Sequence, residues 1–194
     1  MKLPGFSLLE LMVSTVLGAI LLLTASAMFM TFMIGNASTN VRRQMSAEGT
    51  QMLGTLEYHI RNAEDAVVGS SDVTATQTCS ELGTTGKYLT LTNLNGATVT
   101  TACFRDVTES VPTMRLLFHP GLPTLNPPCD ASPANALNSE KVPIETTSSD
   151  SYQFTCTQAA NGKKTIKIEF ILTPNIDDSA INAPFSTTVQ LRNS

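Results

Sequence analysis

The first part of the sequence lacks charge, because no Asp, Glu, Lys or Arg occurs from Leu11 through Val41. Between Phe6 and Ile34 the residues are mostly Leu, Met, Ala, Val, Ile and Phe, and polar residues dominate only from Asn36 onward. The mean hydropathy near zero is therefore the average of a membrane-like segment and a soluble one. At 194 residues the chain has room for one ordinary domain and an appendage.

The sequence also lacks the motifs of common active sites and of nucleic-acid binding. Its two histidines, His59 and His119, have no neighbouring Ser, Cys or Asp that would complete a catalytic arrangement. There is no Gly-rich phosphate loop and no His-Glu-x-x-His pattern. The formal net charge is -4, without a cluster of basic residues. We therefore expect neither enzymatic activity nor a nucleic-acid partner.

Four cysteines lie in the polar part of the chain: Cys79, Cys103, Cys129 and Cys156. None belongs to a C-x-x-C pair or lies beside a histidine, whereas zinc sites are typically built from such paired ligands. Two disulfides are expected instead, which indicates an oxidising compartment such as the periplasm or the cell exterior. Of the possible connectivities, we favour pairing neighbours along the chain, because each pair then closes a loop around a segment without a strong core pattern. These pairs are Cys79–Cys103 and Cys129–Cys156.

The N-terminal apolar stretch is long enough to span a bilayer, since about 20 residues suffice. A secretory signal peptide would have a positively charged start and an apolar core of about 7 to 15 residues. Here the start contains only Lys2 as a basic residue, and the apolar run is much longer. An ordinary signal anchor fits the length but does not explain Glu10. A carboxylate within a spanning helix costs about 2.5 kcal/mol or more and usually has a specific partner, so Glu10 is predicted to be functional.

Residues 5–11, Gly-Phe-Ser-Leu-Leu-Glu-Leu, resemble the prepilin N-terminal motif of type IV pilins, type II secretion pseudopilins and competence pseudopilins. In that family a membrane-embedded prepilin peptidase cuts after the glycine and methylates the new N-terminus. The resemblance implies that residues 1–5 are a leader peptide, that cleavage falls between Gly5 and Phe6, and that Phe6 is N-methylated. It also implies that Glu10 neutralises the Phe6 ammonium of a neighbouring subunit during filament assembly.

The same resemblance implies a location and a set of partners. The precursor would lie in the bacterial inner membrane with its globular domain in the periplasm, and the mature subunit in an extracellular filament. Its partners would be the membrane before assembly, prepilin peptidase, an inner-membrane assembly platform, and other pilin or pseudopilin subunits. Pro4 stands where the family often has a basic residue, and no proline follows until Pro112, so the mid-helix proline of many major pilins is missing. The missing mid-helix proline favours a minor pilin or a pseudopilin.

One long helix is expected after the leader, with residues 6–35 spanning the membrane or forming a filament core and residues 36–68 as its amphipathic continuation. Apolar residues recur at spacings of three and four along the continuation: Val41, Met45, Gly49, Met52, Leu53, Leu56, Ile60, Ala63 and Val67. This stripe predicts that the second part packs on the chain's own globular domain. The Gly69-Ser70-Ser71-Asp72 cluster predicts the end of the helix.

Residues 69–194 have the pattern of β-strands joined by tight turns, so we expect an α+β fold in which the long helix packs on an antiparallel β-sheet domain. The predicted strands are 88–94, 97–105, 113–118, 151–157, 165–172 and 185–192, with turns at Asn95-Gly96 and Asn161-Gly162. Six of the ten prolines lie within 119–150, which predicts a long loop held in part by Cys129. This order of elements is the pilin arrangement, and residues 185–193 resemble the close of W-type minor pilins and J-type pseudopilins.

Several functions are compatible with these features. The leading hypothesis is a minor pilin of a type IV pilus-like filament, and the second is a pseudopilin of a type II secretion system. A third is a membrane-anchored binding module or adhesin that uses the Pro-rich loop and never enters a filament. A fourth, an anchored hydrolase, lacks a nucleophile and base pair in the sequence. Asp177 and Asp178 are the candidates for a metal site, as calcium ligands of the kind that some pseudopilins carry, but adjacent acids in such a loop are more often solvated, so no cofactor is expected.

Overall fold

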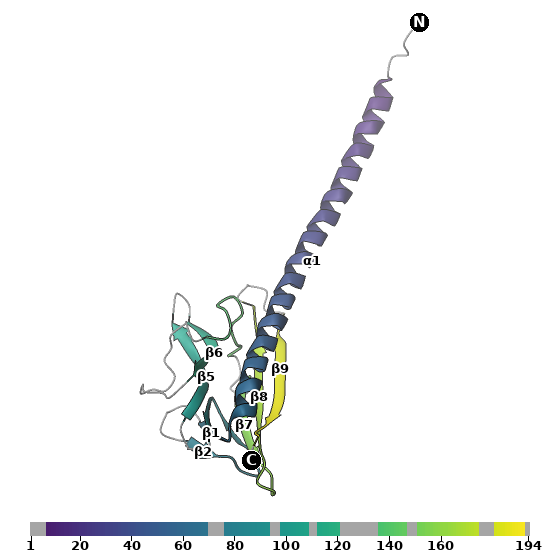
Figure 1. Cartoon of the computed structure of the whole chain (residues 1–194). Coiled ribbons are helices and arrows are strands. Elements are labelled where there is room, and N and C mark those ends of the chain that lie inside the picture. Colours follow the sequence, from purple (N-terminus) through teal and green to yellow (C-terminus); the bar gives the residue numbers. More distant parts are fainter. Residues whose placement is uncertain are drawn as a thin grey trace. The chain divides into compact units, whose positions relative to one another are not determined.

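The computed structural model describes residues 7–69, 76–93, 98–108, 112–120, 136–146, 151–174 and 181–192. The chain divides into two compact units, Met1–Val41 and Arg42–Ser194, which are described separately below. Helix α1 (Leu8–Asn62) supplies the first unit and the first element of the second (Figure 1). The strands that follow are β1 (Asp65–Gly69), β2 (Thr76–Thr78), β3 (Thr84–Gly86), β4 (Tyr88–Thr92), β5 (Thr98–Thr108), β6 (Pro112–Pro120), β7 (Tyr152–Gln158), β8 (Lys164–Leu172) and β9 (Ala183–Gln190).

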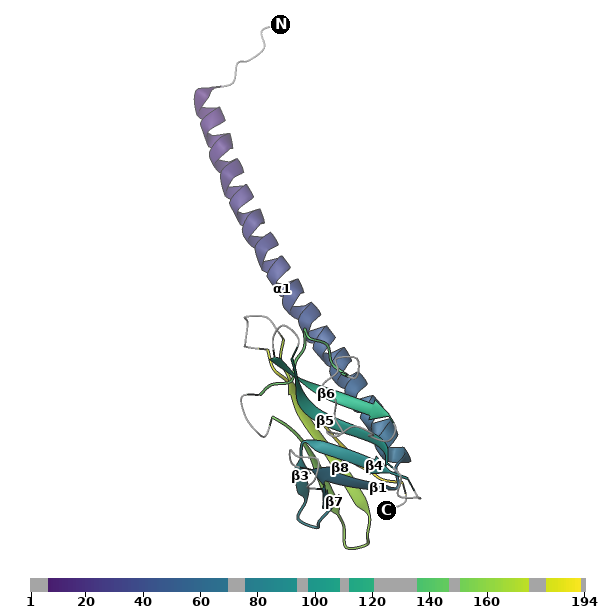
Figure 2. The same cartoon turned by 90° about the vertical axis from the view of Figure 1, so that its left-hand side faces the viewer.

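Two antiparallel sheets form most of the second unit, with strand orders β2-β1-β4-β5-β6 and β3-β7-β8-β9 (Figure 2). The chain crosses between the sheets at Lys87, whose backbone N–H donates to the Gly69 carbonyl over 2.9 Å. A Cβ atom at the preceding Gly86 would lie 2.1 Å from the same carbonyl oxygen, so only glycine fits at this position. The expected α+β fold, a long N-terminal helix packed on antiparallel sheets, is confirmed.

Aromatic rings make up much of the core of the second unit. Phe104 of β5 lies 4.7 Å from Phe154 of β7 and 6.5 Å from Phe170 of β8, measured between ring centroids. The ring of Phe185 in β9 stacks on Phe170 at 5.4 Å with an interplanar angle of 19°. Phe154 and Phe170 are almost completely buried. These contacts join strands of both sheets, and ring pairs of this kind contribute about 0.5–1.5 kcal/mol beyond area burial.

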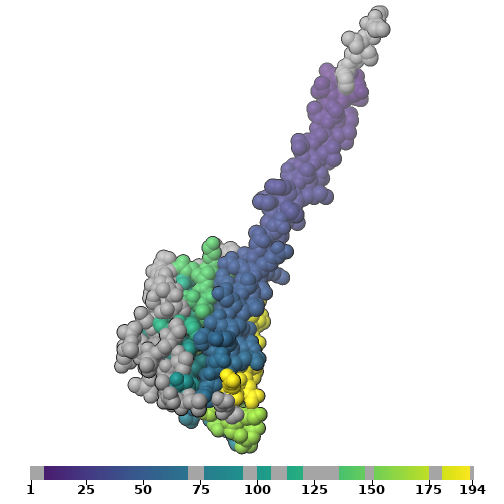
Figure 3. Space-filling view, in the orientation of Figure 1, coloured from purple at the N-terminus to yellow at the C-terminus, as the bar shows by residue number. Residues whose placement is uncertain are grey.

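The second part of α1 buries the apolar stripe that the sequence predicts, namely Met45, Gly49, Met52, Leu56 and Ile60. Figure 3 shows this part of the helix lying along the surface of the second unit beside β9. A Cβ atom at Gly49 would lie 2.3 Å from the ring of Phe185, so the aromatic ring of β9 reaches the helix backbone only because residue 49 has no side chain. The predicted packing of this helix face on the globular domain is therefore confirmed.

The predicted end of the helix was too late, because α1 ends at Asn62 and β1 occupies Asp65–Gly69. In β1 the buried side chains of Ala66 and Val68 alternate with the partly exposed side chain of Val67. The backbone of β1 pairs with that of β4. A two-residue period places the two buried side chains on one face of a strand, whereas a helix would place them 200° apart. The consecutive valines also favour a strand, since β-branched side chains fit the pleated sheet well.

The six predicted strands correspond to β4–β9, with ends shifted by a few residues. Three short strands, β1–β3, were not predicted. The Asn161-Gly162 turn is confirmed, with Gly162 at a φ of 84°, whereas Asn95-Gly96 lies outside the described residues.

Part of the predicted loop 119–150 is bound to both sheets. We call residues 136–146 the strap. Its Asn138 side chain accepts a hydrogen bond of 3.0 Å from the backbone N–H of Leu116 in β6. Farther along, the backbone N–H of Glu145 donates to the Ile171 carbonyl in β8 over 2.8 Å. The strap therefore connects the edge of one sheet with the other sheet.

The favoured disulfide pairing was wrong, because Cys79 is bonded to Cys156, with their Cα atoms 5.0 Å apart. The physical reason is that β3 pairs with β7, which brings the residues before β3 beside the middle of β7. Cys103 is buried in β5 and is also disulfide-bonded, while Cys129 lies outside the described residues. The observed bridge connects segments 77 residues apart and ties the two sheets together.

We predict opposite effects for alanine at two glycines of α1. Gly49→Ala should lower the free energy of unfolding by about 1–3 kcal/mol, because the methyl group displaces Phe185 from its stack. Gly54→Ala is the matched control, since an added Cβ there meets no atom within 4 Å, and it should raise stability by up to about 1 kcal/mol. Urea unfolding of the full chain in detergent, followed by circular dichroism, measures both. Equal effects of the two substitutions would contradict the packing described.

Removing the bridge with Cys79→Ala and Cys156→Ala should cost about 2–5 kcal/mol of stability, because it releases a long loop in the unfolded chain. The same urea unfolding applies under non-reducing conditions, with the oxidised wild-type chain as the reference. A non-reducing peptide map should recover the Cys79 and Cys156 peptides as one species. Recovery of the Cys79 peptide with that of Cys103 would overturn the assignment.

Candidate functional site

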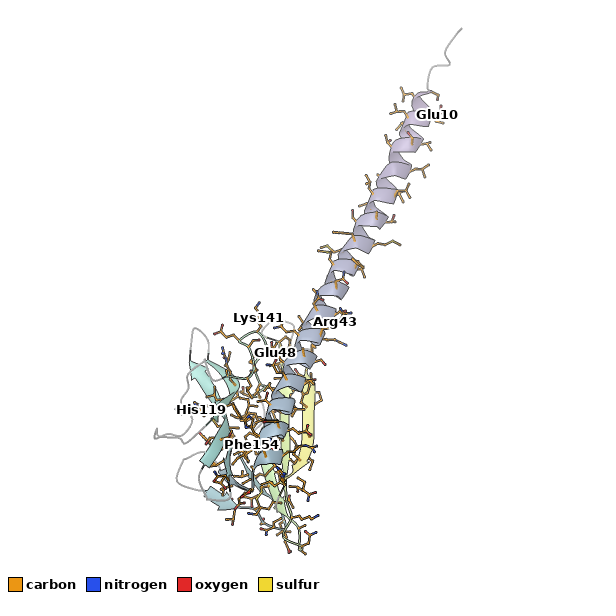
Figure 4. The ribbon with its side chains drawn as sticks, in the orientation of Figure 1. Glu10, Arg43, Glu48, His119, Lys141 and Phe154 are labelled. Atoms are coloured by element: carbon orange, nitrogen blue, oxygen red, sulfur yellow. A yellow bond between two sulfur atoms is a disulfide. The ribbon has the colours of Figure 1, made fainter. Side chains whose placement is uncertain are left out.

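The start of α1 carries the residue that the sequence singles out. The Ser7 carbonyl accepts hydrogen bonds from the backbone N–H groups of Glu10 and Leu11, at 3.0 and 3.2 Å. Glu10 therefore lies in the first turn of the helix, as Figure 4 shows, where the positive end of the helix dipole favours a carboxylate. Its side chain is exposed in the isolated chain.

The other polar side chains of the apolar segment are satisfied within the helix itself. Each hydroxyl donates to a carbonyl three or four residues earlier, over 2.8–3.0 Å, at Ser14, Thr15, Thr24, Ser26 and Thr31. Such bonds allow a hydroxyl to enter an apolar environment at low cost. Between Leu8 and Ile34 this leaves the carboxylate of Glu10 as the single side chain whose polar atoms require a partner from outside the helix.

The apolar surface around Glu10 is not covered by the part of the chain that the structure describes. Leu8 and Leu9 expose 80% and 73% of their surface, and other large apolar side chains of this segment are similarly exposed. Among the described residues, α1 is the one helix long and apolar enough to cross a membrane, and none of its most apolar window is buried. Lipid or other protein must therefore cover this surface.

The structure brings few of the other predicted site residues together. Gly5 and Phe6, the predicted cleavage and methylation site, lie outside the described residues, as do Asp177 and Asp178. Within the described ranges, no three His, Cys, Asp or Glu side chains are grouped so that they could hold a metal ion.

The two histidines lie on opposite faces of the five-stranded sheet. The His59 ring in α1 packs against Phe118 of β6, with ring centroids 4.6 Å apart. His119 follows Phe118 in the same strand, so its side chain points to the other face. Burial lowers the pKa of His59, which favours its neutral form in this aromatic contact. The pair forms no joint site.

Sequence reasoning missed one polar contact of α1. The Glu48 carboxylate accepts hydrogen bonds from the Ser139 backbone N–H at 2.9 Å and from its hydroxyl at 2.7 Å, and a third from Gln44 at 2.9 Å. Glu48 therefore anchors the strap to the helix. Helical periodicity correctly placed Glu48 off the apolar stripe, but no local pattern reveals a partner 91 residues away.

Comparison with known families supports the importance of the N-terminal segment. The family described as the prokaryotic N-terminal methylation motif matches residues 4–26. The matched range contains the Gly5-Phe6 junction, Glu10 and much of the apolar segment of α1. Neither a curated protein nor a solved structure matches the chain.

Proposed function

We propose that this chain, which carries the methylation-motif signature of type IV pilins and pseudopilins, is a minor structural subunit of a type IV pilus-like filament. The observation that carries the proposal is Glu10, whose charge stands alone in a helix segment that satisfies every other polar side chain by itself. Families with this motif are structural rather than enzymatic, so assembly accounts for the signature without a catalytic step.

The proposed partner of Glu10 is the N-terminal ammonium of Phe6 on a neighbouring subunit after cleavage. An unpaired carboxylate at apolar depth is costly, and an opposite charge nearby compensates for much of the cost. Within one subunit the two residues are four positions apart in the sequence, so a helix that extends to Phe6 would also let them pair while the subunit waits in the bilayer. Glu10 thus favours an assembly in which the N-terminal ammonium group of one subunit pairs with the Glu10 carboxylate of its neighbour.

The exposed leucines around Glu10 support the same function. A filament leaves the membrane, so the apolar surface of α1 must move from lipid into contact with other helices. Water exposure would cost about 25 cal/mol for each Å² of apolar surface. Lateral contact with the helices of other subunits is the arrangement that avoids this cost along a filament.

Three features favour a minor subunit over a major one. Helix α1 runs without proline, the globular unit carries a disulfide, and the 119–150 region is rich in proline. A pseudopilin of a type II secretion system is the second candidate, because it shares the same N-terminal signature. Recovery of the chain in sheared surface pili would favour the minor pilin. Restriction of the chain to the periplasm would favour the pseudopilin.

The proposed location follows from the signature and from the disulfide. In this proposal the precursor is anchored in the bacterial inner membrane through α1, and its globular unit lies in the periplasm, where a disulfide such as Cys79–Cys156 persists. The proposed partners are prepilin peptidase, an inner-membrane assembly platform and other pilin or pseudopilin subunits.

Glu10→Gln should abolish incorporation into filaments while the chain still accumulates in the membrane, because it removes the charge and keeps the side-chain size. Ser14→Ala is the control, since the Ser14 hydroxyl bonds only to its own helix, and incorporation should remain within about twofold of wild type. Immunoblots of sheared filaments and of membranes measure both. Normal incorporation of Glu10→Gln would contradict the proposed role of the Glu10 charge, whereas absence of the wild-type chain from sheared filaments would instead support a membrane-anchored binding module.

Mass spectrometry of the mature chain should find an N-terminus at Phe6 carrying one additional methyl group. Expression without prepilin peptidase should leave a chain that begins at Met1. If the chain still begins at Met1 in cells with active peptidase, the filament function is excluded.

A further inference from the structure

We propose that a cavity at the start of the second unit binds the headgroup of an anionic membrane phospholipid. The cavity has a volume of about 350 Å³ and is lined by Arg42, Met45, Ser46, Ile181, Asn182, Ala183 and Phe185. This volume lies at the lower end of the range of small-molecule sites, about 300–1,000 Å³. The proposal requires α1 to enter a membrane and does not depend on filament assembly.

The lining combines apolar side chains with one cation. Met45 and Phe185 come from α1 and β9, the two elements that meet at Gly49, and Ile181 adds a third apolar side chain. Arg42 is the single charged residue among the described lining residues. A guanidinium group beside apolar surface suits an amphiphile that carries a phosphate, because its planar donors match phosphate oxygens while the apolar side chains contact the glycerol and upper acyl carbons.

Three cations of the second unit have no partner within the described part of the chain. The side chains of Arg42, Arg43 and Lys141 make no ion pair or hydrogen bond within the described part of the chain. Figure 4 shows Arg43 and Lys141 at the same end of the second unit, and Lys141 follows Ser139, which Glu48 anchors to α1. Their charge is therefore available to an external anion.

The position of the arginines along α1 favours the membrane as the source of that anion. The apolar run ends at Ile34, and seven uncharged residues separate it from Arg42. Seven helical residues span about 10 Å, and a headgroup region is about 5–8 Å thick on each side of a bilayer, so a long arginine side chain that starts just outside it can reach back to the headgroups. Basic residues beside a spanning helix usually gather on the cytoplasmic side, yet this pair lies across the apolar run from Lys2. Contact with anionic headgroups gives the unusual placement a function.

The test reconstitutes the full chain into nanodiscs of equal phosphatidylglycerol and phosphatidylcholine and counts retained lipids by native mass spectrometry. Wild type should retain phosphatidylglycerol preferentially. Arg42→Gln should reduce the preference about fivefold, the effect expected of one cation near an anionic surface. Ser46→Phe should reduce it similarly, since Ser46 is an exposed lining residue and the larger ring fills the cavity without a change of charge.

Lys163→Gln is the matched control, because Lys163 is an exposed cation in the β7–β8 turn, and it should leave the preference unchanged. Hydrogen exchange of the second unit checks that each variant remains folded. Equal retention of the two lipids by wild type would overturn the proposal, as would a normal preference in Ser46→Phe. If Arg42→Gln keeps the lipid preference but loses crosslinks between copies of the chain, the cation serves a subunit contact and the lipid proposal fails.

Discussion

The structure depends on one constraint, which is that the chain cannot cover the first half of its own helix. The apolar side chains of this segment remain exposed, while its hydroxyl groups are all bonded to the helix backbone. Such a surface is stable only in lipid or against other helices. In either surrounding the charge of Glu10 needs a partner, so the requirement for a membrane and the requirement for a neighbouring subunit arise from the same segment.

The second half of α1 belongs to the same continuous helix, but most of its apolar side chains are buried. Its apolar stripe is covered by the globular unit, and its contact with β9 is close enough that residue 49 must be glycine. Glu48 adds a polar contact to the strap, which is bonded in turn to both sheets. The helix is therefore a structural part of the globular unit, and forces applied to the helix would be carried directly into the core.

Local sequence patterns predicted the elements well and their long-range contacts poorly. The apolar stripe identified the buried face of α1, and alternation found β4–β9, because both patterns depend on neighbouring residues. The same patterns gave no sign of β3 crossing to the other sheet, so the Cys79–Cys156 pair was missed. Glu10 could be singled out from the sequence because an isolated charge in an apolar run is itself a local signal. The cavity at Arg42 could not be found from the sequence, since residues 181–185, which are far from Arg42 along the chain, form much of its wall.

The pairing of β3 with β7 has a consequence for the time at which the globular unit can fold. Strands β4, β5 and β6 are consecutive in the chain and pair in that order, so this meander can form before the rest of the chain is available. Strand β3 precedes them but pairs with β7, more than 60 residues later. A nascent chain must therefore hold β3 unpaired, and Cys79 without its native partner, until β7 is also available. The Cys79–Cys156 bridge would then form in a partly folded chain whose first sheet is already in place.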